Sequence, residues 1–328
     1  MSTPLRGKRL VLLGLGALLL VVLPSLLMWL YFGLWHRPTA HRHMPAGTNI
    51  AVRADAQELL LFGPVRQHLW PLFVGDDGAA DDVSTRRKRL EEATGAKIPQ
   101  DFREVVVASV HAESWVVIFG GKMPRDRFVA GLARFFEQEG ATGWSLEEPI
   151  LRHERGAAVA QAEDGSVIFG TDVAITRAAL ATNDELPLPL ATEGVVSFAV
   201  TAQAYDEGLR LLPSVPGLDA LGKLAQLTGQ ADLGDAPRVH IRMTPEPGED
   251  AAALASQVET ALGALALGLT LMPTDLDGAK EALSGAEVTA KDGAVEVNAP
   301  WPYEALDRMA ARLAERIRAA RSQRAASP

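Results

Sequence analysis

The sequence predicts an α+β protein with an N-terminal transmembrane helix followed by two repeated α/β units with mainly antiparallel sheets. Three observations lead to this prediction. Residues 10–34 contain no charged side chain. Two later segments show the same order of strand, helix and turn signals at similar spacing, which indicates an internal repeat. Each of these segments ends in strands that meet at an Asp-Gly turn, a strong signal for an antiparallel hairpin, with helical patterns before and after it.

The apolar run is long enough to cross a bilayer, because roughly 20 apolar residues suffice to span the hydrocarbon core. It is also longer than the apolar region of a cleaved signal peptide, about 7–15 residues. Trp29, Tyr31, Phe32 and Trp35 gather at its distal end, where aromatic rings favour the headgroup layer. We therefore expect a retained transmembrane helix over residues 10–35.

Charge asymmetry predicts the orientation of this helix. Arg6, Lys8 and Arg9 form a compact basic cluster before it, whereas the basic residues after it are more dilute. Positive flanks favour the cytoplasmic side. We expect a single-pass protein of the bacterial inner membrane with its N-terminus inside and its body periplasmic or extracellular.

The repeat is first indicated by strands and helix ends. Strand-like alternation over Ile50–Arg53 is matched by Val195–Val200, and each is followed by helical residues. Thr94-Gly95 and Thr228-Gly229 then suggest two helix C-termini, because glycine suits a left-handed cap. At equal distances beyond these positions, strands are expected at Val105–Val110 and at Val239–Met243.

The repeat resumes late in each unit. Asp164-Gly165 and Asp292-Gly293 each lie between alternating strands, and each hairpin is followed by a helix. These helices are expected at Asp172–Ala181 and at Tyr303–Arg321.

Between these landmarks we expect a strand at Trp115–Phe119 and an amphipathic helix at Arg125–Glu139 in the first unit. The second unit has the apolar segment Ala251–Met272 in that place. It is interpreted as a buried core helix, because Glu259 within it disfavours the alternative, a second membrane span. The predicted organisation is a cytoplasmic basic tail (1–9), the transmembrane helix (10–35), a juxtamembrane linker (36–45), repeat 1 (46–182), a linker (183–194) and repeat 2 (195–328).

Composition excludes several classes of function. The formal net charge is −9, and beyond residue 43 the chain has 27 basic against 41 acidic residues. Such an acidic body argues against nucleic acid binding, which depends on neutralising phosphates. The chain has no cysteine, which excludes disulfides, cysteine-ligated metals and thiol catalysis.

Three polar clusters contain residue types that bind metals, and each has a simpler interpretation. A histidine cluster after the span is interpreted as an interfacial collar, and an aspartate cluster as a solvated loop. In an Asp-x-Asp-Gly sequence, Asp277 is interpreted as the partner of a helix cap at Thr274. These clusters are His36, His41 and His43; Asp76, Asp77, Asp81 and Asp82; and Asp275, Asp277 and Gly278.

Two adjacent acid–base pairs, His111 with Glu113 and His153 with Glu154, do not continue into a metalloprotease or deaminase motif. We find no nucleophile elbow and no phosphate-binding loop. No catalytic, cofactor-binding or metal-ligating residue and no cofactor are therefore assigned.

The last helix carries a basic row at Arg308, Arg312 and Arg316, opposite Leu306, Met309, Leu313 and Ile317. This pattern predicts an apolar stripe on the core and a solvated basic face. The sharper alternative is contact of this row with anionic headgroups or an acidic envelope partner.

In its single span, duplicated α+β body and Thr-Gly and Asp-Gly landmarks, the chain resembles uncharacterised single-pass envelope proteins of GC-rich bacteria, grouped as domains of unknown function. The resemblance implies no activity. The expected function is a membrane-anchored extracytoplasmic binding or scaffold protein without catalytic activity. The alternatives are an anchored envelope hydrolase that uses His111 or His153, and a lipid- or ligand-binding module with a cavity between the repeats.

Overall fold

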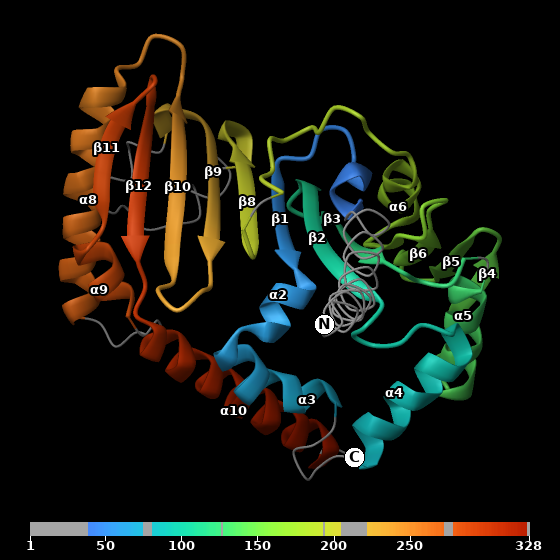
Figure 1. Cartoon of the computed structure of the whole chain (residues 1–328). Coiled ribbons are helices and arrows are strands. Elements are labelled where there is room, and N and C mark those ends of the chain that lie inside the picture. The colour runs from blue at the N-terminus through green and yellow to red at the C-terminus, as the bar shows by residue number, and fades with distance from the viewer. Residues whose placement is uncertain are drawn as a thin grey trace, which may run out of the picture. The chain divides into compact units, whose positions relative to one another are not determined.

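The computed structural model describes residues 39–74, 81–125, 127–192, 194–204, 222–271 and 278–326. Thr39–Pro328 form one compact unit (Figure 1). The basic tail and the predicted transmembrane helix lie outside the described residues.

The body is built on one antiparallel sheet of 12 strands, in the order β11-β12-β10-β9-β8-β1-β2-β3-β7-β6-β5-β4. This result confirms the predicted α+β class with antiparallel pairing. The first seven strands are β1 (Ile50–Asp55), β2 (Phe102–His111), β3 (Ser114–Gly121), β4 (Trp144–Glu147), β5 (Ile150–His153), β6 (Ala158–Gln161) and β7 (Val167–Gly170). The other five are β8 (Val196–Thr201), β9 (Leu224–Asp232), β10 (Arg238–Pro245), β11 (Glu287–Lys291) and β12 (Ala294–Pro300).

The helical elements are η1 (Ala40–His43), α2 (Ala56–Leu61), η2 (Val65–Leu69), α3 (Trp70–Val74), α4 (Asp81–Thr94), α5 (Phe128–Gln138), α6 (Val173–Leu180), α8 (Ala251–Leu271), α9 (Ala279–Ser284) and α10 (Tyr303–Ala326). The predicted helices around residues 125–139, 172–181, 251–272 and 303–321 are all found, with ends shifted by a few residues. Asp172 caps α6 by accepting the N–H of Ile175 at 2.8 Å.

The two halves of the chain meet at the centre of the sheet, where β1 pairs with β8 and Val52 lies opposite Phe198 (Figure 1). Outward from this pair the order is β1-β2-β3-β7 on one side and β8-β9-β10-β12 on the other. Both predicted Asp-Gly hairpins are present, as β6–β7 and β11–β12. The strand order is thus the same on both sides out to these hairpins.

One landmark of the predicted repeat is wrong. Gly95 ends α4 with a positive φ of 77°, as expected, but Thr228 and Gly229 lie inside strand β9. The residues predicted to correspond therefore lie at different places in the two halves. Residues 105–110 belong to β2, the second strand from the centre, whereas residues 239–243 belong to β10, the third strand from the centre on the other side. The glycine has a packing role: a Cβ on Gly229 would lie 2.4 Å from Cζ of Phe198, its partner on β8.

In the first half, both faces of the sheet are covered. Alternate residues such as Val106 and Ile118 pack with Ala40 and Met44 of the η1 segment and with Ala179 of α6. The opposite face packs against Phe128, Leu132 and Phe135 of α5. Leu188 and Leu190, from the predicted inter-repeat linker, are also buried in the first of these cores.

In the second half, α8 packs on one face of the outer strands. Leu254 and Val258 of α8 contact a core that includes Met243, Val295 and Val297. The opposite face carries polar cross-strand pairs: His240 Nδ1 lies 2.7 Å from Asn298 Oδ1, and Arg242 donates to Glu296 at 2.7 Å. Figure 1 shows α8 beside β11 and β12.

Helix α10 returns to the first half and packs on η2. The ring of Tyr303 lies edge-on to Phe62 with centroids 5.6 Å apart, and His68 Nε2 is 3.0 Å from Asp307 Oδ1. The predicted apolar stripe is wrong in part: Leu313 is 48% exposed, whereas Ala305, Ala310 and Ala314 are buried.

Candidate functional site

The structure separates the histidines predicted as a cluster. His41 Nδ1 lies 3.2 Å from Oε1 of Glu104, on β2, whereas His43 Nε2 lies 3.0 Å from Oδ2 of Asp164, in the β6–β7 turn. His36 is outside the described residues. Across the described part of the chain, no group of three His, Asp or Glu side chains comes together as metal ligands would.

Glu104 is the centre of a buried ionic cluster. Arg53 Nε donates to its Oε1 at 2.5 Å, and both side chains are almost completely buried. Burial raises the pKa of Glu104, but the hydrogen bonds and charges of His41 and Arg53 outweigh this effect and lower the pKa below its usual value. The cluster lies under η1 on the covered face of the sheet, which indicates a structural role.

Asp164 attaches the same segment at a second point. It accepts hydrogen bonds from the Thr39 hydroxyl at 2.5 Å and from the backbone N–H of Ser166 at 2.9 Å, in addition to its contact with His43. Burial raises the pKa of Asp164, but these contacts outweigh it and hold the pKa well below the usual range. The described residues of the predicted juxtamembrane linker are therefore fixed to the body from Thr39 onward.

The acidic candidates do not form a site within the described residues. Asp81 and Asp82 belong to the start of α4, and Asp76, Asp77, Asp275 and Asp277 lie outside the described residues. Gly278 occupies the N-cap position of α9 with a φ of 73°.

The two acid–base pairs are far apart. His111 and Glu113 are exposed at the β2–β3 turn, and His153 ends β5. Strands β3, β7 and β6 lie between β2 and β5, which places the two histidines roughly 19 Å apart at the usual strand spacing. His153 instead accepts the N–H of Arg155 at 3.1 Å and packs edge-on to Trp144. These residues do not converge on one site.

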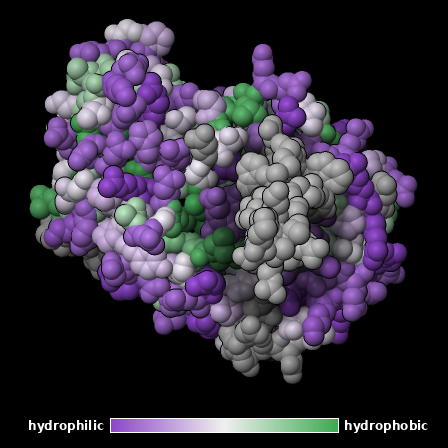
Figure 2. Space-filling view, viewed as in Figure 1, coloured by the Kyte–Doolittle hydropathy of each residue, from purple (hydrophilic) through white to green (hydrophobic). Residues whose placement is uncertain are grey.

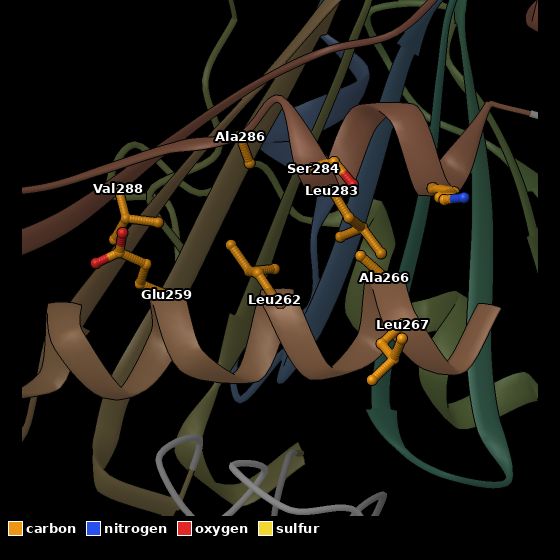
Figure 3. Close-up of a pocket in the computed structure, with 10 residues that line it drawn as sticks. Glu259, Leu262, Ala266, Leu267, Leu283, Ser284, Ala286 and Val288 are labelled. Atoms are coloured by element: carbon orange, nitrogen blue, oxygen red, sulfur yellow. The ribbon is translucent and has the colours of Figure 1, made fainter. Parts of the chain in front are cut away.

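A groove that sequence reasoning missed lies in the second half, between α8, α9 and β11 (Figure 3). It has a volume of about 540 Å³. Its lining comprises Glu259, Leu262, Gly263, Ala266, Leu267, Lys280, Leu283, Ser284, Ala286 and Val288. Figure 3 shows Leu262 and Ala266 of α8 facing Leu283 and Ala286 across the groove.

The exposed side of α8 is unusual for a surface helix. Among the described residues, only Ala251–Leu269 is long and apolar enough to cross a membrane by length and composition, and 28% of that stretch is buried. Leu267 is 66% exposed. The prediction of a buried core helix is therefore correct for one side only, the side on which Leu254 and Val258 pack against the sheet. The signal in the sequence was the absence of any charged residue between Glu259 and the end of α8.

The ends of the groove differ in charge. Glu259 lies beside Val288 at one end, and Leu267 lies near the other (Figure 3). Lys280 belongs to the first turn of α9 and lies one helical turn before Ser284. Among the ten lining residues, Glu259 and Lys280 are the only charged ones, and six are Leu, Ala or Val.

Two further hollows, of about 340 and 690 Å³, flank Leu146 between α5 and the β4–β5 hairpin. Three of the nine residues around the smaller one are charged, namely Arg125, Glu148 and Glu163. The larger has Arg134 and Glu137 at its rim. Figure 2 shows a largely hydrophilic surface on the visible face of the molecule. The larger hollow resembles the α8–α9 groove in composition, because six of its eleven lining residues are Ala, Leu or Trp.

No protein-family model matches the sequence, and no curated protein matches it. Among solved structures, crystal form I of TP0453 is similar, with a TM-score of 0.43 and 9% sequence identity, over 85% of this chain and 99% of that chain. At that level the similarity says nothing about function.

Proposed function

We propose that this protein is a membrane-anchored extracytoplasmic binding protein without catalytic activity, and that the α8–α9 groove holds the apolar part of its ligand. The observation that carries the proposal is the uncharged part of α8 beyond Glu259, where Gly263 and Leu267 are exposed and line that groove. A surface helix normally presents charged residues to water, and a contiguous exposed apolar surface usually marks an interaction site.

The size of the groove favours a small ligand over a protein partner. Its volume of about 540 Å³ falls in the usual range for ligand pockets, about 300–1,000 Å³. A stable protein interface engages roughly 20–30 residues on each side. Ten residues line the groove.

The proposal assigns membrane attachment to residues 10–35 and not to α8. Removing α8 from the sheet would uncover Met243, Val295 and Val297, which it covers now. The surroundings of α8 also include Glu249, Asp250 and Glu281, which oppose contact with an anionic bilayer. Arg308, Arg312 and Arg316 of α10 remain the proposed contact with anionic headgroups or an acidic envelope partner.

We also propose that the two halves arose by duplication. The common strand order outward from β1 and β8, and the hairpin at the end of each series, support this proposal. The proposed ligand site would then have evolved in the second half alone, because only elements of that half line the groove.

The alternative of an envelope hydrolase has no comparable support. It needs His111 or His153 to meet a carboxylate and a nucleophile in a pocket. Within the described residues, His111 is exposed and the two histidines lie on strands separated by three others.

Two experiments test the proposal. A C-terminal tag on the full-length chain should be accessible from outside the inner membrane, and the protein should stay in the membrane after a carbonate wash. Mass spectrometry of full-length protein extracted from membranes should find an apolar compound at near-stoichiometric amounts. A cytosolic tag would overturn the predicted topology, and protein without any bound apolar compound would overturn the proposed binding activity.

A further inference from the structure

We infer that the groove selects a single-chain amphiphile with an anionic head group, held with its head at Lys280 and its chain along α8 toward Glu259. This inference rests on the proposed function and adds the chemical class and orientation of the ligand.

The charge pattern of the groove indicates the head group. Lys280 is the only cation and Glu259 the only anion among the lining residues. An anionic head group is attracted to Lys280 and repelled by Glu259. The hydroxyl of Ser284, on the same side of α9 as Lys280, supplies a hydrogen-bond donor.

The shape of the groove indicates the chain. Leu262, Ala266, Leu283 and Val288 form an apolar path between α8 and the α9–β11 segment (Figure 3). The path from Leu267 to Glu259 extends for about 12 Å at the helical rise of 1.5 Å per residue. An elongated apolar path with a cation at one end fits an acyl chain better than a compact ring system.

Two glycines of α8 provide a matched test of this site. A Cβ built on either Gly263 or Gly268 meets no atom within 4 Å, but only Gly263 lines the groove. Gly263→Leu should therefore fill the groove, whereas Gly268→Leu should leave it open. Both changes replace a helix-interior glycine with a better helix former, so both variants should fold.

The experiment uses the full-length protein in nanodiscs of zwitterionic lipid. It is irradiated with a photoreactive C12 fatty acid or with the corresponding fatty alcohol, and crosslinks are mapped by mass spectrometry. We expect the acid to label α8 and α9 in wild-type protein and in Gly268→Leu, and the labelling to fall at least tenfold in Gly263→Leu. Unlabelled fatty acids should compete with the C12 probe for the site. Each methylene removed from the competitor should weaken this competition by about fourfold.

Lys280→Gln should weaken labelling by the acid about two- to fivefold and leave labelling by the alcohol unchanged, because an exposed ion pair contributes modestly. Lys291→Gln, an exposed lysine of β11 outside the groove, is the control. If acid and alcohol label the groove equally, or if Lys280→Gln has no effect, the inferred head group is wrong and the apolar site stands. If no probe labels α8 or α9, or if Gly263→Leu labels like the wild type, the groove is not the binding site and the proposed function loses its support.

Discussion

His43 presents both ring nitrogens to acceptors inside the protein. Nδ1 lies 2.9 Å from the carbonyl oxygen of Ala179, and Nε2 lies 3.0 Å from a carboxylate oxygen of Asp164. Both contacts are hydrogen bonds when the imidazolium form donates from each nitrogen. The side chain is 1% exposed, so these contacts attach the η1 segment inside the protein.

The substitution Asp164→Asn should destabilise the body by about 1–3 kcal/mol, because an amide has one oxygen and cannot replace both carboxylate oxygens that contact Thr39, His43 and Ser166. Chemical denaturation of the full-length protein measures this change. Asp184→Asn is a matched control, since Asp184 pairs with Arg42 of the same η1 segment but is 95% exposed. The control should change stability by less than about 0.5 kcal/mol. Equal effects of the two substitutions would contradict a buried attachment of η1 at Asp164.

Acid should weaken the protein through the same carboxylates. The pKa values of Asp164 and Glu104 are lowered by folding, so the unfolded chain binds more protons than the folded one in the acid range. Their contribution is fully present above the unfolded pKa values of about 4 and is lost as the pH falls below them. The urea midpoint should therefore fall steeply between about pH 4.5 and 2.5. In Asp164→Asn the slope should be shallower, and an unchanged slope would show that Asp164 does not contribute.

At the scale of elements, periodicity predicted most strands and helices correctly. Alternation over residues 50–53 and 115–119, and the Asp-Gly turns, indicated strands that pair as expected. The failures occur where tertiary packing decides the structure. Strand β9 has glycine in its interior and few β-branched residues, so its local pattern resembled a helix end. Helix α8 contains the apolar residues of a core helix, but which side meets the sheet depends on β10 and β12, far away in the sequence.

The packing of Phe198 on Gly229 leads to a prediction for β9. Gly229→Ala should cost about 1–3 kcal/mol, because the new Cβ would overlap the Phe198 ring and force it to move. Phe198→Leu should relieve the overlap, so the double variant should lose less than the sum of the two single changes. Gly234→Ala, where a Cβ meets no atom within 4 Å, should be nearly neutral. Additive losses in the double variant would contradict this packing.

The candidate site was less predictable than the fold. His41 and His43 contact carboxylates that are far away in the sequence, Glu104 on β2 and Asp164 in the β6–β7 turn. The order of residues in the sequence gives no sign of these partners. The groove requires α9 to lie against α8, and both helices also contact β12. In the sequence, only the lack of charged residues in the second half of α8 indicated the groove.

For the whole molecule, the continuous sheet makes the two halves interdependent. β1 and β8 form its centre, and α10 from the second half packs on η2 in the first. Either half on its own would therefore lose the β1–β8 pairing and the contact between α10 and η2. The same sheet supports the α8–α9 groove at one end and the contacts of η1 over its middle.

The absence of cysteine allows a direct test of this central pairing. Ala54 lies opposite Val196 across β1 and β8, and paired residues of antiparallel strands have Cα atoms about 4.5–5.5 Å apart, within the range of a disulfide. The double variant Ala54→Cys/Val196→Cys in full-length protein should form an intramolecular disulfide on mild oxidation, detected as a crosslinked peptide by mass spectrometry. Ala231 lies opposite Val196 on β9, one strand further from β1. The control Ala54→Cys/Ala231→Cys should not crosslink, because two strand spacings, about 10 Å, exceed disulfide geometry. Crosslinking in the control but not in the test pair would mean that the halves join by another pair of strands.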